Sequence, residues 1–166
     1  CLAAPARFRN ASAYNRAHGG LALLIMEKGQ IVYEDYLDEN PHDLASGTKS
    51  FWGPLSIQLK LDEPACQTLT EWRKDPRKAS IRISHLLNLT SGLDPGSPSG
   101  LLDYREAIAV ESIAPPGQTF LYGPNSFQCL GEVLRRKWGD PLKLLQKTLD
   151  VRAASWKRTP DGNPGV

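Results

Sequence analysis

The chain has 166 residues, of which 40% are hydrophobic and 23% are charged, and its formal net charge is +2. This composition is typical of a folded globular protein and excludes a largely disordered chain. No apolar run reaches the roughly 20 residues that cross a bilayer, and the basic residues form no stripe of the kind that binds nucleic acid. We therefore expect neither a transmembrane segment nor a nucleic-acid partner.

The three cysteines are Cys1, Cys66 and Cys129, and their spacing matches no pattern of zinc ligands. We expect isolated thiols and no metal site. Cys1 allows one further interpretation, because lipoprotein processing leaves a lipidated cysteine at the first position. A lipid anchor at Cys1 would place the protein in the periplasm or at the cell envelope, and nothing else in the sequence assigns a compartment.

The first predicted elements form a β-hairpin. Leu21–Met26 is an apolar run, Gln30–Tyr36 alternates apolar and polar residues, and Glu27–Gly29 lies between them as a short turn. The unbroken apolar run predicts a first strand that is buried on both faces. His18–Gly20 imitates the oxyanion loop of some lipases, but no serine lies in the G-x-S-x-G context of those enzymes, which favours a simple turn into the strand.

Helical patterns fill the remainder of the chain. Asp43–Ser46 offers possible helix caps, and Pro54 predicts that the helix beginning near Gly47 is short or kinked. Further helices are predicted over residues 81–90, 101–112, 125–138 and 141–149. The basic run Arg135–Lys137 would complement the negative end of one of these helices. No linker marks a second domain, so we expect a single domain over residues 1–166.

Ser46 and Lys49 are the residues whose spacing by itself proposes a reaction. A serine hydroxyl is a weak nucleophile at neutral pH and needs an adjacent base. Residues three apart lie on one face of a helix, so the Lys49 amine can reach the Ser46 hydroxyl. A Ser-His-Asp triad that uses His42 or His85 stays open as an alternative, because triads are recognised by geometry rather than by spacing.

The segment Leu44–Gly53, which reads LASGTKSFWG, resembles the start of the active-site helix in the class C β-lactamase and penicillin-binding-protein-like family, which includes many esterases. The predicted hairpin resembles the first two strands of that family. Further matching segments follow in the family's order, at residues 61–64, 83–93, 115–122 and 127–134. The resemblance covers nearly all of the chain and implies an α+β fold, with the N-terminal hairpin of an antiparallel sheet and a helical region.

The resemblance also implies roles for individual residues. Ser46 would be the acylated nucleophile, and its backbone N–H would be one donor of the oxyanion hole. Lys49 would help to remove or relay the Ser46 proton, and Tyr122, which matches the tyrosine of the family's Y-x-N motif, would act with Lys49 as base. The substrate would be a small ester, amide or β-lactam, and no cofactor is implied.

The chain departs from the family's pattern in three ways. Pro124 stands two residues after Tyr122, in place of the asparagine, and Asn125 follows one residue later. Asn125 either takes over substrate binding or caps the following helix. The family's third motif, K-T-G or H-x-G on a late strand, does not occur after Tyr122, and the stretch 53–61 is shorter than in the family.

These departures predict that the chain is the N-terminal portion of a larger fold, without its C-terminal strands. Two strands without further partners are marginally stable, and their open edges favour self-association. Two hypotheses about function remain. The chain is either a serine hydrolase that works through an acyl-enzyme, or a non-catalytic fragment or binding module of the same fold.

Overall fold

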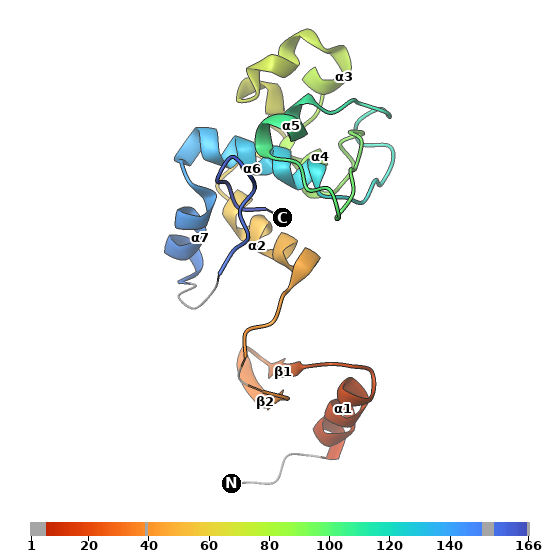
Figure 1. Cartoon of the computed structure of the whole chain (residues 1–166), viewed down its shortest axis with the longest axis vertical. Helices are drawn as coiled ribbons and strands as arrows, with labels where there is room; N and C mark the ends of the chain where they lie inside the picture. Colours follow the sequence, from red (N-terminus) through yellow and green to blue (C-terminus); the bar gives the residue numbers. More distant parts are fainter. Residues whose placement is uncertain (1–5, 39, 151–154, 166) are drawn as a thin grey trace. The chain divides into compact units, whose positions relative to one another are not determined.

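The structure is a computed structural model that describes residues 6–38, 40–150 and 155–165 (Figure 1). The chain divides into two compact units, Cys1–Asp43 and Leu44–Val166. The first unit holds the predicted hairpin and the second holds the helical region, so the α+β fold class is confirmed. The predicted lipid anchor at Cys1 lies outside the described residues, and the expectation of a single domain stays a prediction.

The first unit consists of helix α1 (Ala6–Ala17) and strands β1 (Ala22–Glu27) and β2 (Gln30–Tyr36). The two strands pair antiparallel through a two-residue turn, Lys28-Gly29. Both turn residues have positive φ, 50° and 77°, as the type I′ hairpin turn requires. The predicted hairpin is therefore confirmed.

Helix α1, which was not predicted from the sequence, packs on the hairpin. The Phe8 side chain is buried, and its ring centroid lies 5.7 Å from that of Tyr33 on β2. The Asp35 carboxylate on β2 accepts hydrogen bonds from Arg16 and Ser12 of α1. These bonds, led by that from Arg16, lower the pKa of Asp35 to about 2. An ionised carboxylate thus fixes α1 to the strand.

The prediction that the first strand is buried on both faces is wrong. Leu23 and Ile25 are half-buried, whereas Leu24 and Met26 are 46% and 56% exposed. The alternation follows because successive side chains of a strand point to opposite faces, and α1 packs on one of them. An apolar face of the hairpin therefore remains exposed within this unit.

Short helices and turns build the second unit. The predicted helices at 125–138 and 141–149 are confirmed as α6 and α7, and those at 81–90 and 101–112 are shorter than predicted. The segment 65–79 forms short helices that were not predicted. The bounds of the helices in this unit are η1 Ala45–Thr48, α2 Lys49–Ser56, η2 Ala65–Gln67, η3 Thr70–Lys74, α3 Pro76–Ala79, α4 Ile83–Leu87, α5 Tyr104–Ala109, α6 Asn125–Trp138 and α7 Pro141–Leu149. Among the described helices, none combines the length and the apolar character that a membrane span needs.

Helix α6 is the centre of the second unit, and it contacts α2, α4, α5 and α7 (Figure 1). All ten residues of Asn125–Leu134 are buried, which is the pattern of a helix that is surrounded on every side. Gly131 permits the close approach of α5, because a Cβ at this position would lie 2.4 Å from the Tyr104 ring. The core helix thus begins three residues after Tyr122, so the packing of the core sets where that tyrosine stands.

The basic run at the end of α6 is engaged in ion pairs. The buried Glu132 carboxylate accepts hydrogen bonds from Arg135 and Arg136. Arg136 also binds the Glu71 carboxylate through two nitrogens, at 2.9 and 2.7 Å. As predicted, the three basic residues lie in the last turn of the helix, and the ion pairs additionally tie this turn to the segment 70–74.

Candidate active site

Ser46 and Lys49 meet at the junction of η1 and α2. Ser46 lies in the 3₁₀ turn, and Lys49 is the first residue of the α-helix. Lys49 Nζ donates a hydrogen bond to Ser46 Oγ at 3.2 Å, and both residues are half-buried. Pro54 lies inside α2, which ends at Ser56, so the predicted short helix is confirmed. The structure therefore brings together the two residues that spacing singled out.

The backbone before Ser46 has an unusual conformation. Ala45 has a φ of +43°, in the left-handed region that non-glycine residues rarely occupy. The Ala45 carbonyl accepts a hydrogen bond from Thr48 Oγ1 at 2.8 Å, which holds the turn closed. The N-cap positions of η1 and α2 are Leu44 and Thr48, and neither makes a capping hydrogen bond. The predicted capping side chain is therefore absent from both positions, and the Ser46 hydroxyl faces Lys49 instead.

The environment of Lys49 shifts its pKa below the ordinary value. The amine lies 5.5 Å from the ring centroid of Tyr122 and 5.6 Å from that of Phe127. Burial lowers the pKa of Lys49, and the interaction with Tyr122 opposes this shift. A lowered pKa increases the fraction of neutral amine, which is the form that accepts a proton from a serine.

The ring of Tyr122 lies beside the Lys49 amine. The segment that carries it is fixed by Leu121, whose backbone N–H donates to the Leu89 carbonyl at 2.8 Å. Tyr122 is 52% exposed. Within the part of the chain that the structure describes, its hydroxyl makes no hydrogen bond to Ser46 or Lys49. The structure thus places Tyr122 at the site, with its ring rather than its hydroxyl next to the amine.

Asn125 is buried and bonded to the loop that contains Asp94. It is 1% exposed, its backbone N–H donates to the Pro95 carbonyl at 3.2 Å, and its Nδ2 donates to the Asp94 carbonyl at 3.0 Å. Pro124 takes the N-cap position of α6, so Asn125 does not cap this helix. The substrate-binding role of Asn125 stays a prediction, and its contacts favour a role in holding the loop that contains Asp94.

This loop, residues 94–96, packs tightly on the turn that follows Tyr122. A Cβ on Gly123 would lie 2.1 Å from the Pro95 carbonyl oxygen, and a Cβ on Gly96 would lie 2.7 Å from Asn125 Nδ2. Both glycines are therefore required by the close approach of the two segments. This contact was not predicted from the sequence, in which Gly96 and Gly123 were the available signal.

In the described structure, Ser46 Oγ is hydrogen-bonded to Lys49, whereas the polar contacts of His85 and His42 are with other residues. His85 Nδ1 accepts a hydrogen bond from the Arg82 backbone N–H at 3.2 Å, and burial, together with the charge of Arg82, lowers the pKa of His85. His42 Nε2 lies 3.2 Å from an Asp38 carboxylate oxygen. Among the described residues, no cluster of histidine, cysteine and carboxylate side chains could hold a metal ion.

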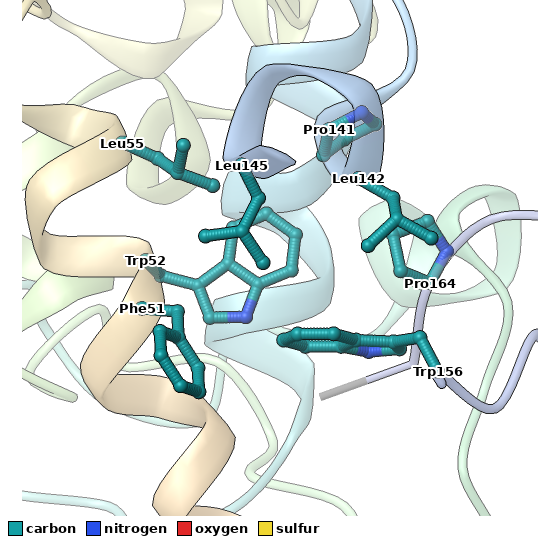
Figure 2. A pocket seen from close by; sticks show the side chains of 8 residues that line it. All are labelled: Phe51, Trp52, Leu55, Pro141, Leu142, Leu145, Trp156 and Pro164. Carbon is teal, nitrogen blue, oxygen red and sulfur yellow. The ribbon is translucent and has the colours of Figure 1, made fainter. Parts of the chain in front are cut away.

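An apolar groove lies elsewhere in the second unit, between α2, α7 and the C-terminal segment (Figure 2). It encloses about 190 Å³ of space, part of which is open to solvent. Its lining is Phe51, Trp52, Leu55, Pro141, Leu142, Leu145, Trp156 and Pro164. None of the four predicted site residues lines this groove, so the candidate chemistry does not lie there.

Comparisons with known proteins identify the family and the fold. The sequence model of the Beta-lactamase family matches residues 6–147. Among solved structures, the chain is similar to a "putative beta-lactamase from Bacteroides dorei DSM 17855", with a TM-score of 0.62 and 19% identity, over 85% of this chain and 49% of that chain. It is also similar to a "putative 6-aminohexanoate-dimer hydrolase from Bacillus anthracis", with a TM-score of 0.59 and 19% identity, over 78% and 43% of the respective chains. No curated protein matches the sequence.

At this level of identity, the solved structures show the fold alone, and the chain spans about half the length of each. The predicted correspondence to the N-terminal portion of the fold is confirmed. The family match covers most of the chain and includes Ser46, Lys49, Tyr122 and Asn125. The chain therefore belongs to the beta-lactamase family.

Proposed function

We propose that the chain carries the nucleophile of a serine hydrolase, in which Ser46 forms an acyl-enzyme with an ester, amide or β-lactam. The observation that carries the proposal is the 3.2 Å distance between Lys49 Nζ and Ser46 Oγ, in a half-buried position where the pKa of the amine is lowered. The family match and the names of the two structural relatives, one a beta-lactamase and one a hydrolase, support the same reaction class.

In the proposed reaction, the neutral Lys49 amine accepts the Ser46 proton while Oγ attacks the carbonyl carbon of the substrate. The carbonyl π electrons move to oxygen, and the Ser46 backbone N–H, in the first turn of the helical segment where N–H groups lack intrahelical partners, stabilises the oxyanion. Collapse of the tetrahedral intermediate expels the leaving group, which takes a proton from the lysine. Water then cleaves the acyl ester, and the Ser46 hydroxyl is regenerated.

Tyr122 would act with Lys49 in these proton transfers. Its ring lies next to the amine, and its side chain is half exposed, so a bound substrate or a water molecule can reach it. Asn125 and the loop 94–96 would hold the turn that carries Tyr122. In this proposal, Ser46 forms the bond to the substrate and Lys49 transfers the protons. The turn between Tyr122 and α6 holds Tyr122 in place.

Labelling with a fluorophosphonate tests the nucleophile. The 166-residue chain should gain one phosphonyl adduct by mass spectrometry, and Ser46→Ala should abolish it. Ser50→Ala is the matched control, because Ser50 is an exposed serine on the same helix, and it should be labelled like the parent chain. Equal labelling of the parent chain and Ser46→Ala would refute the assignment.

The alternative function is a non-catalytic member of the fold. Pro124 in place of the Y-x-N asparagine, and a Tyr122 hydroxyl without a bond to Lys49 in the described structure, favour it. Turnover of p-nitrophenyl acetate and of a chromogenic cephalosporin separates the two. Steady Ser46-dependent turnover supports the enzyme, whereas a single adduct at Ser46 without turnover supports the non-catalytic alternative.

A further inference from the structure

Two aromatic side chains are exposed beside the Ser46–Lys49 pair. Phe120 is 64% exposed and Tyr122 is 52% exposed. Their ring centroids lie 6.3 Å apart, with an angle of 35° between the ring planes. Exposed large apolar side chains are common among the described residues, but this pair is distinguished by the contact between its two rings and by the position of Tyr122 next to Lys49. Two adjacent exposed rings next to a candidate nucleophile point to a binding surface.

The backbone between the two rings is fixed to the core of the unit. Leu121 lies between them, is half-buried, and its backbone N–H donates to the carbonyl of the buried Leu89 at 2.8 Å. Phe120 and Tyr122, on either side of this anchor, stay exposed and keep their rings near each other. The pair is thus held without burial of either ring.

The Phe120–Tyr122 pair lies next to the reactive atoms through Tyr122. Lys49 Nζ lies 5.5 Å from the Tyr122 ring centroid and 3.2 Å from Ser46 Oγ. A substrate whose carbonyl carbon stands at Ser46 can therefore extend its acyl group across Tyr122 toward Phe120. Aromatic faces bind apolar and aromatic groups through offset or edge contacts.

We propose that Phe120 and Tyr122 form an aromatic platform that binds an apolar, preferably aromatic, acyl group of the substrate. The inference rests on the proposed function and deepens it by naming the substrate class. The platform suits a neutral acyl group. Lys49 is the one cationic side chain that the described structure places against these rings. Because the proposed reaction needs Lys49 as a neutral base, it offers no positive charge to pair with an acidic acyl group. Phe120 is thus a specificity-determining residue, and its contribution should depend on the size and aromaticity of the acyl group.

The kinetic test compares p-nitrophenyl phenylacetate with p-nitrophenyl acetate. The ratio of their kcat/KM values should fall about fivefold to tenfold in Phe120→Ala. The ratio should be restored in Phe120→Trp, which keeps an aromatic face. Ile57→Ala is the matched control, since Ile57 is 81% exposed and its truncation should leave the ratio unchanged. An equal loss for both esters in Phe120→Ala would overturn the platform.

A binding test separates the failure of this inference from the failure of the proposed function. Methyl phenylacetate is added to Ser46→Ala, which cannot be acylated at this position, and saturation-transfer NMR reports contact with the aromatic protons of the ligand. Transfer should be strong in Ser46→Ala and lost in Ser46→Ala/Phe120→Ala. Binding with this pattern supports the platform even where hydrolysis is absent, whereas an absent signal in Ser46→Ala, or an equal signal in both variants, overturns it.

Discussion

Lys49 Nζ and Ser46 Oγ are joined by a hydrogen bond of 3.2 Å, and the same amine lies over the faces of two aromatic rings. A charged amine is attracted to such faces, whereas burial disfavours its charge. The net effect is a lowered pKa, in which burial is the larger influence. Lys49 therefore lowers the free energy of unfolding when its amine is charged.

We expect Lys49→Met to raise the melting temperature at neutral pH. Since the pKa of Lys49 is lower in the folded state than its ordinary value of 10.5, the unfolded state binds more protons between these two pKa values. Stability accordingly rises with pH across that window and stays reduced below it. Methionine fills a similar volume without charge, so the gain should be present at pH 7 and should vanish above pH 10.5. Lys143→Met, at an exposed lysine of α7, is the control, and a lower melting temperature of Lys49→Met at pH 7 would contradict the expectation.

The rate of Ser46 labelling should depend on pH through the same amine. Only the neutral form of Lys49 accepts the serine proton, so the fluorophosphonate reaction should accelerate with rising pH. Because the pKa is lowered, the midpoint should lie below 10.5. The measurement is the second-order rate constant of adduct formation between pH 6 and pH 10. A rate that follows hydroxide concentration without a plateau, and that is unchanged in Lys49→Met, would exclude lysine as the base.

Local sequence signals predicted the helices and strands whose ends are marked by proline, glycine or a capping side chain. Helix α7 begins at Pro141, where a missing N–H costs nothing, and Asp140 accepts a hydrogen bond from the Leu142 backbone N–H. The hairpin follows from alternation and from Gly29 in its turn. The Ser46–Lys49 contact was likewise predictable, because it spans a single helical turn.

Contacts between distant segments could not be predicted in this way. Helix α1 reads ARFRNASAYNRA, without a clear apolar stripe, and its anchor is the Asp35 carboxylate on a strand that follows later. The bond from Asn125 to the Asp94 carbonyl spans 31 residues. No periodicity encodes either contact, so the sequence left Asn125 open between substrate binding and a helix cap and did not predict its bond to the loop.

The left-handed conformation of Ala45 should affect the free energy of unfolding. An L-residue in this region costs about 1–2 kcal/mol relative to its preferred conformation, whereas glycine adopts it freely. We therefore expect Ala45→Gly to leave the free energy of unfolding unchanged or to raise it by up to about 1 kcal/mol. Ala13→Gly, at an exposed position inside α1, should instead lower it by about 1 kcal/mol. Urea unfolding measures both, and equal losses would show that Ala45 carries no strain.

Asn125→Asp should loosen the loop that supports Tyr122. The change replaces the Nδ2 donor with a carboxylate oxygen that faces the Asp94 carbonyl in a buried position. An unmade buried hydrogen bond costs about 1–3 kcal/mol, and more for a charged group. Thermal unfolding should show this loss at pH 7 and a partial recovery near pH 4, because a protonated carboxyl can donate as the amide did. Asn88→Asp, at an exposed asparagine, should change little at either pH, and a loss in Asn125→Asp that does not recover in acid would speak against the loop contact.

The ion pairs at the end of α6 predict how the second unit unfolds in acid. The hydrogen bond from Arg136 lowers the pKa of Glu71 to about 2. Burial works against ionisation of Glu132, but the hydrogen bonds from Arg135 and Arg136 outweigh it and lower its pKa as well. Both folded-state values lie below the ordinary 4.5, so the stabilisation is complete above pH 4.5 and is lost as the pH falls toward 2.

The four tryptophans, at positions 52, 72, 138 and 156, all lie in the second unit, so their fluorescence reports its unfolding. Glu71→Gln should flatten the decline of the melting temperature between pH 4.5 and pH 2, since it removes one carboxylate whose protonation is linked to unfolding. Glu111→Gln, at an exposed glutamate outside the ion pairs described above, should keep the slope of the parent chain. The same slope in Glu71→Gln and in the parent chain would show that the Arg136–Glu71 bond contributes nothing to stability, and the acid transition would then have to come from other carboxylates.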